Sequence, residues 1–399
     1  MNGGATSDSV TVLLYSVNGT GLGHLTRLMA IARWVRTLLN GFNLRGKIFF
    51  LSCSEADFLL AANGFPSFKL PSRNALRDAQ IPPDEGIPLI RRLAAGALDQ
   101  IDPQIVIIDT FPTGTYDELL PILGRDDITK VFIFREQRPE YASAIPYEKL
   151  LISFQQMLIP HPEGSFPLTF DPPAALDVTW TGDIIFGERK ELWTKQKVRE
   201  TLGIPRNKTI VYSAAGGGGD REMSRYLQTL VDVAAEFPNV HLVVGVGPLN
   251  RQQLIQRPGV TQTTFYPISR MFGGFDFAIS SSGYNSVNEL IFFGLPAILF
   301  AQTRQADDQS ARARRVADSG AAIAIDPFSA DSLRSAMQRM MDPEVRRAVR
   351  DRGASLIPEN GARRAAQAIL RLALPRVFPN TEFPGLQPDA SLASVGGLS

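Results

Sequence analysis

Two glycine-rich loops in this sequence could hold an anionic ligand. Each loop follows a short apolar run and precedes an amphipathic run. Glycine lets a backbone approach a ligand closely, and the N-terminus of a helix favours negative charge. Each loop therefore predicts an anion site, with a plain tight turn as the alternative. The first loop contains Gly21 and Gly23 and ends at His24, and the second contains Gly216, Gly217, Gly218 and Gly219.

A third stretch, Ser280–Ser286, is rich in hydroxyl groups and leads into an apolar run that holds Glu289. We expect it where a strand ends and a helix begins, because backbone N–H groups, hydroxyls and the helix dipole can converge on an anion there. A capping box between Ser286 and Glu289 is the alternative, but it explains only those two residues. The candidate ligand-binding residues of this stretch are Ser282, Gly283, Asn285, Ser286 and Glu289.

Two further pairs of residues could act on hydroxyl groups. Asp308 and Gln309 place a carboxylate beside an amide, which suits neighbouring sugar hydroxyls, although a solvated helix start has the same composition. His24 is a candidate general base because the ordinary pKa of His lies near neutrality. Asp109 ends an apolar run, where it orients His24, acts as the base itself or caps its loop.

The composition excludes several classes of protein. The chain has 399 residues, with 41 Lys+Arg against 40 Asp+Glu, three His and one Cys. A near-neutral charge gives no global attraction to nucleic acid, and a single Cys excludes a disulfide scaffold. No apolar run approaches the roughly 20 residues of a membrane helix, and no leader with a basic and then an apolar segment is visible. These features predict a globular, cytoplasmic protein.

Short apolar strands alternate with amphipathic helices along most of the chain, which predicts α/β architecture with parallel sheets. Two such series predict two Rossmann-like doubly wound domains, residues 1–180 and 181–360. A further helix is expected over 361–376 and a disordered tail over 377–399. Residues 71–88 are rich in Pro and Gly and predict a loop. Each candidate stretch follows a strand, at the end of a parallel sheet where ligands bind.

Together these stretches resemble a known family. The run Ser282–Ser286, followed by Glu289 and Asp308-Gln309, is similar to the nucleotide-sugar signature of GT-B glycosyltransferases, and most of all to MurG-like bacterial enzymes of glycosyltransferase family 28. The loop that ends at His24, followed by Leu25-Thr26-Arg27, resembles the GxGHxxR start of a group of predicted bacterial glycosyltransferases. The resemblance implies two domains facing a cleft, the first binding an acceptor and the second a nucleotide-sugar donor.

The resemblance also implies roles for matching residues of the second domain. Glu289 matches the residue that binds the ribose hydroxyls of the donor, and the segment from Phe265 to Ile268 matches the one that borders the base. Asp308 and Gln309 match positions that hold the donor sugar. The positions that match the phosphate-binding turn and the loop opposite it are Ser282, Gly283, Asn285 and Ser286, and Gly216, Gly217, Gly218 and Gly219.

Three departures from the family pattern concern these donor contacts. The same block also resembles the signature of plant secondary-product glucosyltransferases, which have a His where this chain has Ser281 and an Asn where it has Arg312. The second glycine loop lacks the Ser and Gln that MurG-like enzymes carry among its glycines.

The implied reaction moves a sugar from a nucleotide diphosphate, UDP by resemblance, to an acceptor hydroxyl with inversion at the anomeric carbon. Neither a metal nor a cofactor beyond the nucleotide sugar is expected, because the sequence has no DxD motif and its three His show no metal-ligand spacing. Two alternatives are a sugar-nucleotide epimerase of the UDP-GlcNAc type and a non-catalytic donor-binding subunit.

The partners other than the donor are less defined. The acceptor is a sugar, a lipid-linked molecule or an aromatic small molecule, since loops of the first domain carry both Tyr116 and Arg135. Nucleic acid is not expected, and no oligomeric state is predicted. Residues 301–376 contain 14 Arg, no Lys and 9 acidic residues. This surplus could attract an anionic donor or touch the inner face of an anionic membrane, with ordinary helix surfaces as the simpler interpretation.

Overall fold

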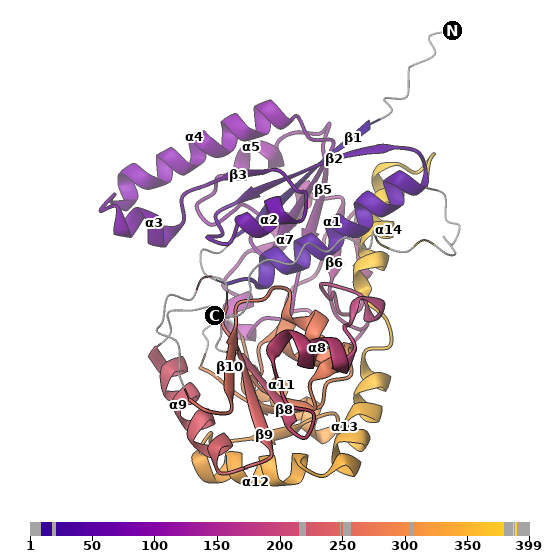
Figure 1. Cartoon of the computed structure of the whole chain (residues 1–399). Helices are drawn as coiled ribbons and strands as arrows, with labels where there is room; N and C mark the ends of the chain where they lie inside the picture. The colour runs from indigo at the N-terminus through magenta and orange to yellow at the C-terminus, as the bar shows by residue number, and fades with distance from the viewer. Residues whose placement is uncertain are drawn as a thin grey trace. The chain divides into compact units, whose positions relative to one another are not determined.

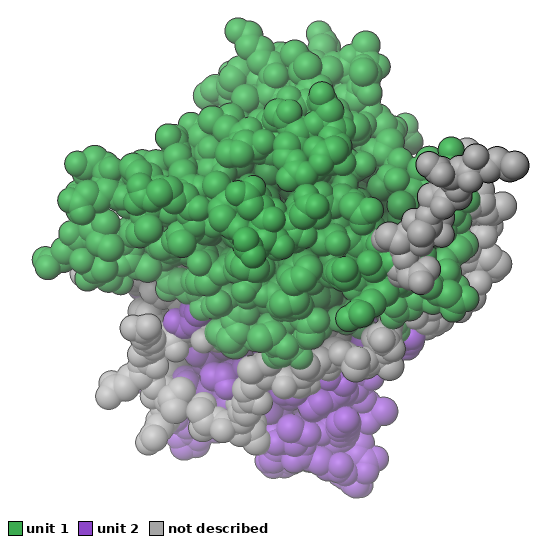
Figure 2. Space-filling model, turned by 90° about the horizontal axis from the view of Figure 1, so that it is seen from above, with its two compact units in different colours: residues 1–186, 360–392 green, residues 187–359, 393–399 purple. Residues whose placement is uncertain are grey.

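The computed structural model describes residues 9–17, 21–214, 221–247, 249, 257–303, 307–378, 386 and 388. The chain divides into two compact units, coloured green and purple in Figure 2. Unit 1 combines Met1–Phe186 with Asn360–Leu392, and unit 2 combines Gly187–Glu359 with Ala393–Ser399. The main part of unit 2 is therefore inserted into unit 1.

Unit 1 is built on a seven-stranded parallel sheet (Figure 1). The strand order is β3-β2-β1-β4-β5-β6-β7. The strands are β1 (Ser9–Ser16), β2 (Arg45–Ser52), β3 (Ser67–Lys69), β4 (Ile105–Asp109), β5 (Thr129–Ile133), β6 (Gln156–Ile159) and β7 (Asp177–Trp180). The helices are α1 (Gly23–Gly41), α2 (Phe58–Ala62), α3 (Arg73–Asp78), α4 (Pro83–Ile101), α5 (Leu120–Leu123), α6 (Pro139–Ala142), α7 (Tyr147–Leu150), the 3-10 helix η1 (Leu151–Ser153) and α14 (Gly361–Ala373).

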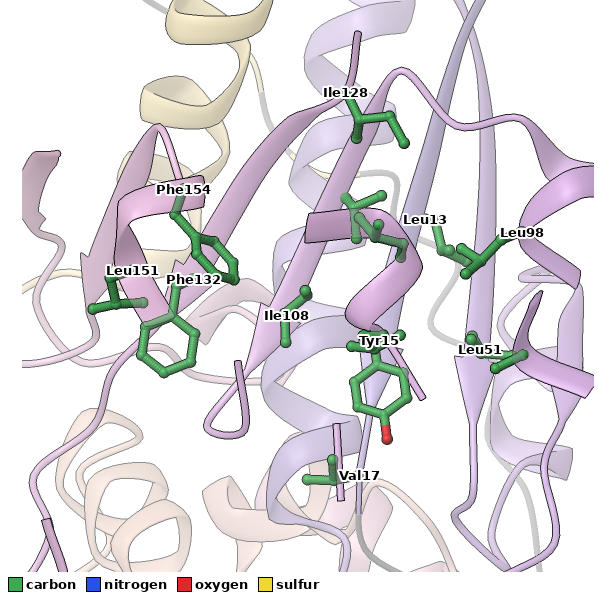
Figure 3. Packing of buried hydrophobic residues seen from close by; sticks show 14 of the residues in the cluster. Leu13, Tyr15, Val17, Leu51, Leu98, Ile108, Ile128, Phe132, Leu151 and Phe154 are labelled. Carbon is green, nitrogen blue, oxygen red and sulfur yellow. The ribbon is translucent and has the colours of Figure 1, made fainter. Parts of the chain in front are cut away.

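Alternate residues of these strands pack on opposite faces of the sheet, as the pleat requires. Leu13, Tyr15 and Ile108 point to the face that α4 covers, where they join Leu98 in one apolar cluster (Figure 3). Helices α1 and α14 pack against each other; α1 also contacts β1 and β2, and α14 contacts β6. The sheet is thus covered on both faces, as in other parallel α/β domains.

The loop expected over residues 71–88 is wrong, because the structure forms α3 and most of the first half of α4 there. Ser72 caps α3 by accepting a hydrogen bond from the N–H of Ala75. Pro83 takes the first position of α4, where a missing N–H leaves no intrahelical hydrogen bond unmade. Pro82 and Pro83 therefore mark the start of a helix, and Pro88 lies inside it.

The segment after α14 returns to unit 1 in part. Phe378 is buried, and its ring lies 4.5 Å from that of Phe42 between centroids. Leu386 lies so close to Gly41 that a Cβ there would stand 2.9 Å from its Cδ1. These two residues belong to the tail expected to be disordered, and they pack against the end of α1.

Unit 2 has a six-stranded parallel sheet with the order β10-β9-β8-β11-β12-β13. The strands are β8 (Thr209–Ala214), β9 (Val240–Gly245), β10 (Val260–Thr263), β11 (Phe277–Ser281), β12 (Ala297–Phe300) and β13 (Ile323–Ile325). The helices are the 3-10 helices η2 (Arg189–Glu191) and η3 (Ile268–Gly274), with α8 (Lys195–Leu202), α9 (Arg221–Ala235), α10 (Tyr284–Phe292), α11 (Gln309–Asp318), α12 (Ala330–Met340) and α13 (Pro343–Leu356). The expected fold class, two Rossmann-like doubly wound parallel-sheet domains, is confirmed.

The strand order reverses once in each sheet, between β1 and β4 in unit 1 and between β8 and β11 in unit 2. In open α/β sheets, ligands bind at the carboxyl ends of the strands at such a switch point. The loops and strand ends at these points include the first glycine loop, Asp109 and the Ser280–Ser286 stretch. Across the described ranges, no helix is both long and apolar enough to cross a bilayer.

Candidate active site

His24 and Asp109 meet at the switch point of unit 1. His24 lies in the first turn of α1, and Asp109 is the last residue of β4. The His24 Nδ1 and Asp109 Oδ2 atoms are 3.0 Å apart, the carboxylate is fully buried and the imidazole is 12% exposed. A carboxylate accepts, so Nδ1 carries the proton and Nε2 has a lone pair. Among the described residues Nε2 has no hydrogen-bond partner, so it can accept a proton from a ligand.

Arg27 binds the same carboxylate oxygen. It is 3% exposed, and its Nε and Nη2 atoms donate to Asp109 Oδ2 at 3.2 and 3.0 Å. Burial alone would raise the pKa of the Asp109 carboxyl, but Arg27 and His24 together outweigh burial and hold this pKa well below its usual range. Burial lowers the pKa of His24, Asp109 opposes this shift, and Arg27 and Arg135 add to it. The result is an ionised Asp109 beside a neutral imidazole.

Thr110 follows Asp109 with a φ of 70°. A β-branched residue in this left-handed region stores on the order of 1–3 kcal/mol of strain, which persists where the surroundings fix it. Here the Thr110 N–H donates to the carbonyl of Ile133, and its Oγ1 donates to Asp109 Oδ1 at 3.0 Å. Sequence reasoning missed Thr110, because nothing in its residue type signals a positive φ.

The loop beyond Thr110 is held by a buried carboxylate. Glu118 is 2% exposed and accepts hydrogen bonds from the hydroxyl of Tyr15 and, at 2.7 Å, from the N–H of Tyr116. Gly114 has a φ of 87°, and a Cβ there would lie 2.5 Å from the Glu118 carboxyl carbon. The segment after Asp109 is therefore fixed by its own side chains.

The glycines of the first loop lie at the start of α1. Gly23 is the first residue of the helix, and Gly21 precedes the N-cap residue Leu22, which offers no side-chain cap. The first helical N–H groups of such a terminus have no intrahelical acceptor. Gly216, Gly217, Gly218 and Gly219, the residues of the second glycine loop, lie outside the described residues.

In unit 2, α10 begins at Tyr284 with Gly283 as its N-cap, and no side chain caps it. The alternative of a capping box between Ser286 and Glu289 is wrong, because the N-cap is Gly283 and the helix begins three residues earlier than that motif requires. Ser286 is instead the third residue of the helix, and Asn285 is the second. The open terminus keeps its N–H groups and its dipole directed at the turn after β11.

The Ser282 hydroxyl binds within the protein and stabilises this turn, so it is not directed at a ligand. The side chain is fully buried, and both its Oγ and its N–H donate to the carbonyl of Phe300 at 2.8 Å. The Ser282 carbonyl accepts a hydrogen bond from Arg312 Nη1 at 2.9 Å. A ligand contact by Ser282 would have to come from its backbone.

Glu289 is half-buried on α10, beyond the first turn. Burial raises the pKa of its carboxyl to about 8. Burial also raises the pKa of Tyr212 and of Tyr266, and the Glu289 charge adds to both shifts, so the two phenols lie near the carboxyl. Among the described residues no hydrogen-bond donor reaches the Glu289 carboxyl. It can therefore accept hydrogen bonds from ligand hydroxyls.

Asp308 and Gln309 are held by local contacts. Asp308 is exposed, and its Oδ1 accepts from the N–H of Ala311, so it caps α11. Gln309 is buried, and its Oε1 accepts from the N–H of Gln302 at 3.0 Å. The Gln309 side-chain amide lies 3.9 Å from where a Cβ on Gly283 would stand. Of the pair, Gln309 is the one that the structure brings next to the α10 turn.

Arg312 ties the loop before α11 to the same turn. It is 6% exposed, and its Nη1 and Nη2 atoms form a forked ion pair with Asp307 at 3.2 and 2.7 Å, in addition to the bond to the Ser282 carbonyl. From the sequence alone, Arg312 stands out only because plant enzymes have an Asn at its position. Its role as a clamp depends on a partner 30 residues away and could not be read from spacing.

Phe265 lies just past β10, and Ile268 opens η3. The Phe265 ring packs on Trp193 with 4.8 Å between centroids. Lys197 Nζ lies 4.2 Å from the centre of the Trp193 ring. This aromatic pair stands beside the segment for which a base contact is predicted. In the ranges that the structure describes, no three His, Cys, Asp or Glu residues are grouped as metal ligands.

A family model supports the interpretation of unit 2. The model described as the glycosyltransferase family 28 C-terminal domain matches residues 217–369. One curated relative is the UDP-N-acetylglucosamine--N-acetylmuramyl-(pentapeptide) pyrophosphoryl-undecaprenol N-acetylglucosamine transferase of Desulforudis audaxviator (strain MP104C), 27% identical over 144 residues. That match covers 33% of this chain and 39% of the relative, so it spans well under half of either protein.

Solved structures share the fold over nearly the whole chain. The glycotransferase of kitacinnamycin superposes with a TM-score of 0.63 at 18% identity, covering 92% of this chain and 99% of its own. MurG of Acinetobacter baumannii superposes with a TM-score of 0.56 at 16% identity, covering 91% and 99%. Two other structures with this fold are complexes, one with thymidine diphosphate and one with UDP-2-fluoroglucose and pterostilbene.

Two doubly wound sheets with these matches define the fold of the protein, which is the GT-B fold of the solved glycosyltransferases on which it superposes. Within that fold the chain resembles MurG, and its residues 217–369 match the glycosyltransferase family 28 C-terminal domain. The resemblance drawn from the sequence is confirmed.

Proposed function

We propose that this protein transfers a sugar from a nucleotide diphosphate donor to an acceptor hydroxyl, with inversion at the anomeric carbon. The observation that carries the proposal is the His24–Asp109 pair at the switch point of unit 1. The chain that supplies this pair also carries the family 28 domain. A proton acceptor in one unit and a nucleotide-sugar domain in the other are the two parts that the reaction needs.

The chemical step uses His24 Nε2 as the base. As the acceptor oxygen attacks the anomeric carbon, its proton passes to Nε2 and the bond from the anomeric carbon to the diphosphate oxygen breaks. Asp109 stabilises the imidazolium through Nδ1 and holds the ring orientation. A single displacement inverts the anomeric centre and needs no protein nucleophile.

The leaving diphosphate gains negative charge, and the start of α10 is suited to stabilise it. Gly283 permits close approach, and the N–H groups of Tyr284, Asn285 and Ser286 occupy the first turn. Loss of one preorganised donor of this kind costs about 2.7–4 kcal/mol of barrier. We assign the ribose hydroxyls to Glu289 and the sugar to Gln309, with Asp308 beside it. Such donors can replace a divalent ion, so the proposed reaction is metal-independent.

The donor nucleotide is proposed to be UDP. The name of the curated relative specifies a UDP-sugar, although one solved structure of the fold holds thymidine diphosphate instead. That relative acts on a pyrophosphoryl-undecaprenol acceptor by its name, and the pterostilbene in another complex is aromatic. We propose a cytoplasmic enzyme with a hydroxyl-bearing acceptor, and with peripheral membrane contact if that acceptor is lipid-linked.

A donor panel tests this function without knowledge of the acceptor. UDP, dTDP and GDP are compared by thermal shift, where a ligand at about 100 times its Kd adds about 2.7 kcal/mol of stability. UDP-GlcNAc and UDP-glucose are then incubated with wild type and His24→Gln in EDTA. Slow release of UDP by wild type and not by the variant supports a transferase. An epimeric sugar nucleotide would indicate an epimerase, and binding without turnover would indicate a donor-binding subunit.

A further inference from the structure

One oxygen of Asp109 receives three N–H donors. Arg27 supplies two of them, from Nε and Nη2, and His24 Nδ1 supplies the third. His24 and Arg27 stand three residues apart on α1, so both side chains project from the same face of the helix. We propose that Arg27 is a positioning residue that keeps Asp109 an ionised hydrogen-bond acceptor and leaves His24 neutral, with Nε2 ready to take a proton. The inference deepens the proposed function and rests on it for its catalytic meaning.

The geometry favours arginine at this place. A planar guanidinium presents fixed donors to a carboxylate, whereas a lysine ammonium would act as a single point charge. Arg27 and Asp109 are both almost wholly removed from solvent, so neither charge is balanced by water. The second carboxylate oxygen is occupied by Thr110 Oγ1 at 3.0 Å. The carboxylate is therefore satisfied on both oxygens while it still faces His24.

Three charged groups around His24 decide whether its imidazole is neutral, and Arg27 is one of them. The charged groups that act on the imidazole are Asp109 from β4, Arg27 from α1 and Arg135 from the segment after β5. Burial favours the neutral imidazole most strongly, whereas the charge of Asp109 favours the imidazolium. An imidazolium has no lone pair on Nε2 and cannot act as a base. Arg27 opposes that outcome because its charge offsets that of the carboxylate at the same oxygen that His24 contacts.

A purely structural role, in which Arg27 only ties α1 to β4, makes a different prediction. Loss of a tie would expose the imidazole to water and move its pKa upward in both single variants, because burial is what lowers it most. Loss of the electrostatic role shifts the His24 pKa upward when Arg27 is removed and downward when Asp109 is neutralised. The opposite signs of the two single variants therefore separate the two roles.

The experiment is an NMR titration of the full-length protein, which has only three His to assign. In wild type, the nitrogen shifts should show a protonated Nδ1 and an unprotonated Nε2 at pH 7. Arg27→Gln should raise the pKa of His24 by about one unit or more, and Asp109→Asn should lower it. Arg36→Gln is the matched control, because Arg36 lies on the same helix and binds the carbonyls of Asn63 and Gly64.

Arg27→Gln leaves a buried carboxylate without its cation, which destabilises the fold. Arg27→Lys and the double variant Arg27→Gln/Asp109→Asn then carry the test. The lysine variant should give an intermediate His24 pKa, and the double variant a value below that of Arg27→Gln. An unchanged His24 pKa in a folded Arg27 variant, or a shift in the control of the same size, overturns the proposal.

Kinetics add a readout that keeps the two proposals separate. If the protein is a transferase, the acid limb of its kcat/KM profile should move to higher pH in Arg27→Lys by the shift that NMR reports. Nucleotide affinity should stay unchanged. If the pKa moves as expected but no donor is turned over, the role of Arg27 stands and the proposed function fails.

Discussion

At the scale of single residues, burial and charge set the protonation state of each group in the proposed reaction. The Asp109 carboxylate is buried yet ionised, because Arg27 and His24 both donate to it. His24 is largely buried and its pKa is lowered, so it is neutral at physiological pH. A neutral imidazole with one open nitrogen is the form that a general base requires.

His24→Gln should lower kcat/KM by about 10²–10⁴-fold, the usual contribution of a general base. Glutamine keeps a donor that can reach Asp109, so the nucleotide affinity and the melting temperature should change little. In wild type the acid limb of kcat/KM should have its midpoint below 6.5, because the His24 pKa is lowered. A variant that keeps most of its activity with an unchanged profile would remove His24 from the mechanism.

Glu289 should link nucleotide binding to proton release. Its pKa of about 8 means that the carboxyl is mostly protonated at pH 7 before a ligand binds. Ribose hydroxyls that donate to the carboxylate favour its ionised form and lower the pKa, so UDP affinity should rise between pH 7 and 9. Calorimetry in two buffers of different ionisation enthalpy measures the protons released. Proton uptake, or an affinity independent of pH, would contradict the assignment.

Glu289→Gln is the control for that linkage, because it should bind UDP more weakly and release no proton. It also tests the sign of the effect on stability. The folded-state pKa is raised above the ordinary 4.5, so the stability from this group is present below pH 4.5 and is lost as the pH rises through about 8. Relative to wild type, the glutamine variant should therefore gain stability between pH 5 and pH 9.

At the scale of elements, much of the fold follows from sequence. Strands β4 and β6 are short, apolar and flanked by breakers, which is the pattern that the alternation of strands and helices predicts. Helix α4 was missed, since its Pro and Gly residues are typical of loops when their place in the helix is unknown. The edge strands β3 and β13 were missed because three residues carry too little periodicity.

The candidate site is likewise predictable from the sequence only in part. Strand-to-helix loops locate the candidate residues, since topology brings the carboxyl ends of central strands together. Side-chain partners do not follow from spacing: Ser282 bonds to Phe300, and Asp308 bonds to its own helix. In the sequence, Arg312 is notable only because it replaces an Asn of the plant signature. Its contacts join two loops that are far apart in the sequence, and only the folded chain defines them.

The clamp formed by Arg312 predicts a defect in donor binding. Arg312→Ala removes the ion pair to Asp307 and the hydrogen bond to the Ser282 carbonyl, so the loop before α11 loses its tie to the α10 turn. We expect the KM for the donor to rise about tenfold, which corresponds to about 1.4 kcal/mol, with a smaller change in kcat. Arg314→Ala, on the same helix and exposed, is the matched control. Equal effects of both variants would contradict the clamp.

At the scale of the whole molecule, the arginine surplus of residues 301–376 has a structural use. Arg346 donates to the carbonyls of Met340 and Met341 at the end of α12, and Arg350 donates to the carbonyl of Gly294 just past α10. Helix ends leave carbonyls without intrahelical partners, and a long cationic side chain satisfies them. The simpler interpretation of the surplus, helix packing rather than attraction of an anion, is therefore favoured for these residues.

The two units should respond separately to the donor. The diphosphate, ribose and sugar contacts of the proposed reaction lie in unit 2, on α10 and at the start of α11, whereas the His24–Asp109 pair belongs to unit 1. Saturating UDP should therefore slow amide hydrogen exchange most strongly over residues 281–292 and 300–312. Exchange in residues 105–110, at the end of β4, should change much less. The His24–Asp109 pair acts on the acceptor hydroxyl, and UDP alone does not supply one.

Exchange measured with UDP and with the Glu289→Gln variant sharpens that test. The variant should lose protection in residues 281–292 at the same UDP concentration and recover it at a higher one, since only the ribose contact is weakened. Inorganic pyrophosphate should protect the start of α10 in both proteins, because it lacks a ribose. If UDP instead protected mainly residues 21–30 and 105–110, unit 1 would be the nucleotide-binding unit and the proposed division of roles would be reversed.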